Sequence, residues 1–177
     1  LPISTDTLVP SIESAIRNIM LGQDYYRKEF GVESTDIFLP DCFGFGWTLP
    51  AIASHCGLIG FSSQKLQWRN KPFYGNDKYP FTVGLWQGID GSTIMMTHGY
   101  DYNQRFEDGD LSENKDLLEL TGHSPLHMVY RYYGTGDIGG SPTLESVRAV
   151  EKGLQGNGPL QIVSATSDRI YKDRSEE

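Results

Sequence analysis

The sequence predicts an α/β fold in which a mainly parallel sheet is flanked by helices. Short apolar runs alternate with stretches of helical periodicity, Gly and Pro mark most of the boundaries, and only one hairpin pattern interrupts the alternation. Strands that alternate with helices favour a parallel sheet whose faces the helices cover. In such sheets the working residues collect at the C-terminal ends of the strands.

The first element is a predicted helix over residues 11–30. Ile12, Ile16 and Ile19 recur at helical spacing, and Gly31 follows as a plausible C-terminal cap. Further helices are predicted over 49–57, over 142–153 and at the end of the acidic stretch 105–120.

Apolar runs bounded by turn residues predict the strands. A hairpin is predicted over 81–100, where the letters "IDG" supply the turn, and a loop rich in Lys, Asn, Pro and Gly is predicted over 68–80. Buried strands are expected at 35–40, 58–66, 127–134 and 160–165.

Composition narrows the class of protein. A chain of 177 residues is long enough for one domain with a sizeable core, and its net charge of -8 argues against a nucleic-acid partner. No apolar run approaches the roughly 18 residues that a membrane span needs, so we expect a soluble protein of the cytoplasm or periplasm. The two cysteines, Cys42 and Cys56, could form one bridge on spacing alone, but small buried hydrophobes are the simpler interpretation.

Charged side chains follow three of the predicted strands. Asp41 comes after "DIFLP", Gln64, Lys65 and Trp68 follow "GFSS", and Asp137 lies in the glycine-rich turn after "HMVYRYYG". Because the C-terminal ends of parallel strands meet at one edge of a sheet, a carboxylate, a cation and a second carboxylate are expected there together.

Two simpler interpretations compete with a site at this edge. Asp41 stands beside Phe43, Phe45 and Trp47, and a partly desolvated carboxylate is either paired or functional. Asp41 could instead cap the helix that follows, and Lys65 could be an ordinary surface lysine.

The turn around Asp137 also offers a nucleotide-binding alternative. The letters "GTGDIG", residues 134–139, match G-x-G-x-x-G between a predicted strand and a helix, and Asp168 follows the next predicted strand. However, Asp137 would place a negative charge in a pyrophosphate cradle, and too few residues follow for the usual nucleotide-binding half.

Five segments, in order, resemble the class II alpha-mannosidases, glycoside hydrolase family 38. They are "STDTLVPSIESAIRNIMLGQDYYRKEFG", "FLPDCFGFGWTLPAI", "GFSSQKLQW", "LWQGIDGSTIMMTH" and "YGTGDIGGSPTLE". The resemblance implies that residues 1–177 form a single domain, the central portion of a (β/α) barrel-like N-terminal catalytic domain that is incomplete at both ends. It also implies a retaining glycosidase that removes terminal alpha-linked mannose from glycans, as in N-glycan degradation.

The resemblance assigns roles to individual residues. Asp41 matches the family's nucleophile, which is also a zinc ligand, and Asp137 is the best match to the acid/base aspartate. The implied substrate-binding residues are Lys65, Trp68, Phe43 and Tyr133.

Zinc is implied only for the complete enzyme. The family's other ligands are a His-x-Asp and a distant His, which this chain lacks, and its four histidines form no HExxH or HxH pair. We therefore expect missing flanking domains of the same polypeptide and no activity from this chain alone. Besides a nucleotide-binding module, the other alternative is a non-catalytic carbohydrate-binding domain with an exposed aromatic platform.

Overall fold

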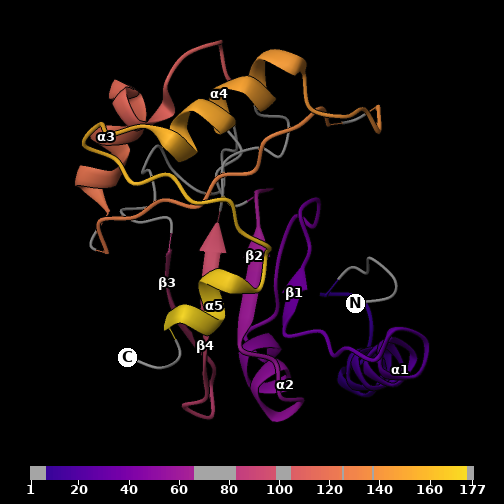
Figure 1. Cartoon of the computed structure of the whole chain (residues 1–177). Coiled ribbons are helices and arrows are strands. Elements are labelled where there is room, and N and C mark those ends of the chain that lie inside the picture. Colours follow the sequence, from indigo (N-terminus) through magenta and orange to yellow (C-terminus); the bar gives the residue numbers. More distant parts are fainter. Residues whose placement is uncertain (1–6, 66–82, 99–104, 125, 137, 175–177) are drawn as a thin grey trace. The chain divides into compact units, whose positions relative to one another are not determined.

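The computed structural model describes residues 7–65, 83–98, 105–124, 126–136 and 138–174 (Figure 1). These residues belong to two compact units. The first unit takes its residues from 1–68, 84–98 and 167–177, and the second from 69–83 and 99–166. None of the helices in the described ranges is both long and apolar enough to cross a bilayer.

The first unit is built on a four-stranded sheet with the order β1-β2-β4-β3 (Figure 1). The strands are β1 (Asp36–Phe38), β2 (Gly60–Ser63), β3 (Val83–Gln87) and β4 (Thr93–His98). β1 runs parallel to β2, and β2 runs parallel to β4. The predicted sheet, mainly parallel and flanked by helices, is therefore confirmed.

The predicted hairpin is part of this sheet. The Gly88 amide donates to the Ser92 carbonyl at 2.8 Å, and Gly91 takes a φ of 86° that favours glycine. The sequence predicts an insertion at this place, but the second strand of the hairpin, β4, lies beside β2 with Ser63 in register with His98. The hairpin thus adds two strands to the sheet.

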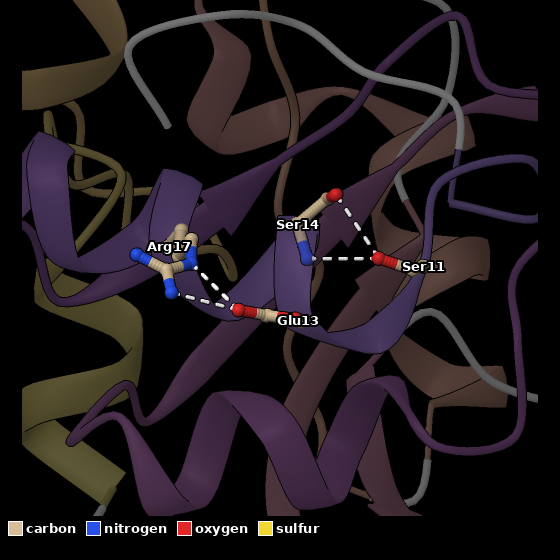
Figure 2. Close-up of polar contacts among 4 residues, drawn as sticks. All are labelled: Ser11, Glu13, Ser14 and Arg17. Carbon is tan, nitrogen blue, oxygen red and sulfur yellow. Dashed lines mark hydrogen bonds and ion pairs between the residues drawn. The ribbon is translucent and has the colours of Figure 1, made fainter.

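Helix α1 (Ile12–Phe30) begins where the sequence predicts. Figure 2 shows the reason: the Ser11 hydroxyl accepts a hydrogen bond from the Ser14 amide at 3.2 Å, which satisfies one of the amides that a helix start leaves open. One turn on, the Arg17 guanidinium lies 2.7 Å from the Glu13 carboxylate. This exposed pair adds only a few tenths of a kcal/mol, about what an i, i+4 pair contributes.

The helix ends also follow the predicted glycines. Gly31 ends α1 in the left-handed conformation, with φ at 68°, and Gly57 follows α2 (Leu49–His55) with φ at 77°. Both helices pack against the strands and form one apolar core. Its buried residues are Ile19, Ile37, Leu39, Leu49, Ile52, Ala53, Leu58, Phe61 and Ile94.

Helix α5 (Arg169–Arg174) is not predicted from the sequence. It is only 6 residues long, too short for a clear apolar periodicity, although its pairs Asp168–Lys172 and Arg169–Asp173 have helical spacing. Tyr171 packs its ring on Gly60 and is 1% exposed, and its hydroxyl lies 2.9 Å from the Thr97 hydroxyl. Tyr171 therefore joins α5 to two strands of the sheet.

The second unit contains helices. They are η2 (Leu111–Glu113), α3 (Lys115–His123) and α4 (Leu144–Gln155). Leu111, Leu117 and Ala149 form its buried core. The helices predicted over 142–153 and at the end of 105–120 are confirmed.

Two predicted strands are wrong: in the described residues, 127–134 and 160–165 belong to no strand. Leu160 and Ile162 do alternate toward the core of the second unit, but they pack on helices. The Leu160 amide donates to the Ser112 carbonyl at 3.1 Å, so its hydrogen bond is made with a helical turn. Extended chain that packs on helices has the same period of two as a strand, and sequence alone does not separate them.

Replacing Gly60 by Ala tests the contact between α5 and the sheet. A methyl group at this position would overlap the Tyr171 ring, so we expect Gly60→Ala to lower the free energy of unfolding by about 1–3 kcal/mol, as overpacking does. Urea unfolding measures the change. Gly122→Ala is the control, because Gly122 is helical with open space around its Cα, and the change should stabilise by about 0.4–1 kcal/mol. Equal midpoints for wild type and Gly60→Ala would contradict the packing.

The hairpin turn predicts a loss of stability in acid. The Ser92 hydroxyl and amide, and then His55, donate to Asp90 and lower its pKa from 3.8 to about 2. The pKa of this carboxyl is lower in the folded chain than in the unfolded chain. The stability that Asp90 contributes to the fold is therefore present above pH 4 and is lost as the pH falls toward 2. Asp90→Asn should therefore lower the melting temperature near neutral pH, and the difference from the wild type should shrink as the pH falls from 4 toward 2. Glu151→Gln, a substitution at an exposed position of α4, is the control. A difference in melting temperature between wild type and Asp90→Asn that stays constant at every pH would contradict this prediction.

Candidate functional site

The parallel pairing of β1 and β2 brings the candidate residues to one edge of the sheet. Phe38 at the end of β1 is in register with Ser62 near the end of β2. Asp41 follows β1, and Gln64 and Lys65 follow β2. Because both strands point the same way, the segments that leave them emerge at the same edge.

Asp41 contacts both residues through one oxygen. The Lys65 ammonium lies 3.1 Å from Asp41 Oδ1, and the Gln64 side-chain amide donates a hydrogen bond to the same oxygen at 3.3 Å. Among the described residues, no hydrogen bond reaches Asp41 Oδ2. The Asp41 side chain is 56% exposed, whereas that of Lys65 is 15% exposed. A largely buried cation and an amide thus hold one oxygen of an accessible carboxylate.

The aromatic turn after Asp41 has an inner and an outer part. Phe45 packs its ring edge-on to Phe61, with 4.8 Å between the centroids, and so anchors the turn in the core. Phe43 is 56% exposed, and its ring centroid lies 5.4 Å from the Lys65 ammonium, in the range of a cation–π contact. Trp47 is also exposed. The turn therefore presents one flat apolar face, that of Phe43, close to the Lys65–Asp41 pair.

The end of β2 buries polar groups. Ser62 and Ser63 are each 1% exposed and Gln64 is 9% exposed. In the described part of the chain the Ser63 hydroxyl has no hydrogen-bond partner. Burying a polar group without a partner costs free energy, so packing alone does not account for a strand that ends this way. The polar end of β2 fits a site better than a core.

Both simpler interpretations of these residues fail. Thr48 is the N-terminal cap of α2, and Asp41 bonds to Gln64 instead of to an amide of that helix. Lys65 is largely buried and paired with Asp41, so it is not an ordinary surface lysine. Cys42 and Cys56 are half-buried and no disulfide joins them, as the sequence favours.

Several predicted residues are not tested by this geometry. Asp137 and Trp68 lie outside the described residues, so their roles as acid/base and pocket wall stay predictions. Tyr133 belongs to the second unit, where its ring lies 6.2 Å from that of Phe106 and is 38% exposed. Its role as a pocket wall also stays a prediction.

The turn around Asp137 does not have the setting of a nucleotide site. A bridge between Thr135 and Gly140 closes it, and Gly139 has a φ of 62°. The dinucleotide fingerprint requires a strand immediately before its first glycine, and the described residues leading to Gly134 form none. The geometry thus gives the nucleotide-binding alternative no support.

Asp36 is a second carboxyl in the first unit, but it lies at the other end of β1. Burial, and then the charge of Asp168, raises its pKa. A raised pKa suits a general acid. However, Asp36 is in register with Gly60 at the start of β2, far from the C-terminal ends of these strands, which Asp41 follows. Asp36 is therefore not placed to act together with Asp41.

The described residues do not by themselves fit a zinc site. Zinc takes three or four N, O or S ligands, and no three His, Cys, Asp or Glu side chains gather in the described ranges. Asp41 could supply one ligand, but its Oδ1 already faces the Lys65 cation.

The sequence places Gln64 at this strand end but assigns it no role. The contact with Asp41 depends on the register of β1 against β2, which the sequence does not supply. In the sequence, a role for Gln64 is indicated by its position beside Lys65 at the end of a predicted parallel strand.

Comparison with known proteins gives a consistent result. Residues 3–174 match the Glycosyl hydrolases family 38 N-terminal domain. The chain is 37% identical to Alpha-mannosidase G of Dictyostelium discoideum and 32% identical to Alpha-mannosidase of Saccharomyces cerevisiae. These alignments cover 96% and 97% of the chain but only 15% and 16% of the two relatives.

The fold has a counterpart among solved structures. An alpha-mannosidase from Enterococcus faecalis superimposes with a TM-score of 0.60 over 99% of this chain and 20% of its own, at 16% identity. That likeness concerns the fold alone. Because the family pattern extends over nearly the whole sequence and two relatives exceed 30% identity, the chain belongs to glycosyl hydrolase family 38.

Proposed function

We propose that this chain forms the nucleophile side of the active site of a retaining alpha-mannosidase. One observation carries the proposal: a carboxylate of a family 38 chain stands at the C-terminal edge of parallel strands, with one oxygen held by Lys65 and Gln64. Accessible, and fixed in orientation beside a cation, Asp41 has the properties that a carboxylate nucleophile requires. Residues 1–177 would then be the central portion of a larger catalytic domain.

The first chemical step is attack by Asp41. An electron pair of its carboxylate forms a bond to the anomeric carbon of a terminal alpha-linked mannose, and the glycosidic C–O bond breaks. The leaving oxygen takes a proton from a carboxylic acid, a role that we propose for Asp137. The product is a covalent mannosyl-Asp intermediate.

The second step is hydrolysis of the intermediate. The same acid/base residue, now ionised, takes a proton from water while the water oxygen attacks the anomeric carbon. The bond to Asp41 breaks, the carboxylate is restored, and two inversions give net retention. Retaining enzymes hold the two carboxyl groups about 5 Å apart, which in this chain requires Asp41 and Asp137 to converge.

The surroundings of Asp41 suit a sugar. The exposed ring of Phe43 offers an apolar face to the C–H groups of mannose, and Lys65 can donate to a hydroxyl as well as to Asp41. Trp68 and Tyr133 are proposed as further walls. Zinc stays a proposal for the complete enzyme, whose other parts would have to supply the remaining ligands.

The exposed rings of Phe43 and Trp47 would also suit a carbohydrate-binding domain without catalysis. The two functions differ in what they require of Asp41. Binding to aromatic faces alone survives the loss of the carboxylate, whereas turnover does not.

Asp41→Asn in the complete enzyme tests the proposal. The amide cannot act as the nucleophile, so we expect kcat on an aryl alpha-mannoside to fall by roughly 10³-fold or more. The 177-residue chain by itself should show no turnover. Steady-state kinetics of both proteins measure these outcomes.

Asp24→Asn is the matched control, because Asp24 is also an accessible acid paired with a lysine, Lys28, at 2.7 Å. It should keep wild-type kinetics. Wild-type turnover by Asp41→Asn would contradict the proposed function, and mannoside binding without turnover in the unmodified enzyme would favour the carbohydrate-binding domain.

A further inference from the structure

We infer that Gln64 is a positioning residue that fixes which oxygen of Asp41 attacks the sugar. Its side-chain amide donates to Asp41 Oδ1 at 3.3 Å, which leaves Oδ2 for the reaction. The inference rests on the proposed function of Asp41 and adds a residue that acts through the nucleophile.

Lys65 alone does not fix the orientation of the carboxylate. The terminal torsion of an Asp side chain is broad and roughly two-fold, so its two oxygens exchange readily. An ammonium is a compact point charge that attracts either oxygen, whereas an amide N–H bonds along a defined direction. Gln64 supplies the direction that the Lys65 charge lacks.

The surroundings of Gln64 keep its amide in place. It follows β2 directly, is 9% exposed, and comes after two serines that are each 1% exposed. A side chain confined in this way holds a geometry that a solvent-exposed glutamine would not. Such confinement matters because a displacement of about 1 Å in a reacting group can slow a reaction about 10²-fold.

Gln23 provides the contrast. It is also partly buried, but its amide donates to the Ser34 carbonyl at 2.6 Å and its oxygen accepts from the Ser34 amide at 2.8 Å. Gln23 therefore ties two backbone segments together, whereas Gln64 bonds to the candidate nucleophile. The pair allows a structural effect to be separated from a kinetic one.

The test uses the complete enzyme and two substitutions of similar size. Gln64→Met removes the donor, and we expect kcat on an aryl alpha-mannoside to fall about 10- to 100-fold while KM changes less than about three-fold. The rate should also depend more steeply on the leaving group, because attack by Asp41 becomes the slow step. Gln23→Met should lower the urea midpoint and leave kcat and KM unchanged.

Gln64→Asn is the second variant. It keeps an amide but shortens the side chain by one methylene, so the donor no longer reaches Asp41 Oδ1 as the Gln64 amide does at 3.3 Å. We expect the same fall in kcat with little change in KM. This variant keeps the inference testable if Gln64→Met does not fold.

The outcomes separate the two claims. Wild-type kcat and leaving-group dependence in Gln64→Met or in Gln64→Asn would overturn the role of Gln64 while Asp41→Asn remains inactive. An active Asp41→Asn would overturn the proposed function itself.

Discussion

The contact between Asp41 Oδ1 and the Lys65 ammonium is the interaction on which the site depends. It exists because β1 and β2 are parallel and in a register that brings their following segments together. Burying the Lys65 ammonium costs free energy unless a carboxylate lies close to it. The burial of Lys65 and the position of Asp41 therefore depend on each other. The strand end is specified by charge as much as by packing.

The aromatic turn anchors Asp41 to the core and leaves the carboxylate accessible from outside. Phe45 belongs to the core through Phe61, while Phe43 stays exposed beside Lys65. The backbone that carries Asp41 is therefore anchored on one side and open on the other. The proposed attack on a sugar ring requires both properties: a fixed position of the carboxylate and an apolar face next to it.

Most of the first unit could be predicted from local patterns, and the reasons are specific. Ser11 and Gly31 bound α1 because capping is a property of single residues, and "IDG" gives the hairpin turn for the same reason. The partners of the strands could not be predicted so directly. Period-two packing on helices imitates a strand at 160–165, and the role of Gln64 appears only once the register is known. Asp41 and Lys65 could be predicted from the sequence because a charged group at the end of an apolar run is partly desolvated, and such a group is either paired or functional.

The most direct measurement is to trap the covalent intermediate. The complete enzyme would be incubated with a fluorinated mannoside that carries a good leaving group, which slows hydrolysis of the intermediate more than its formation, and the labelled peptide would be identified by mass spectrometry. We predict one fluoromannosyl label, on Asp41 in the peptide containing "FLPDCFGFGW". A label on any other carboxylate, in an enzyme that turns over the unmodified mannoside, would contradict it.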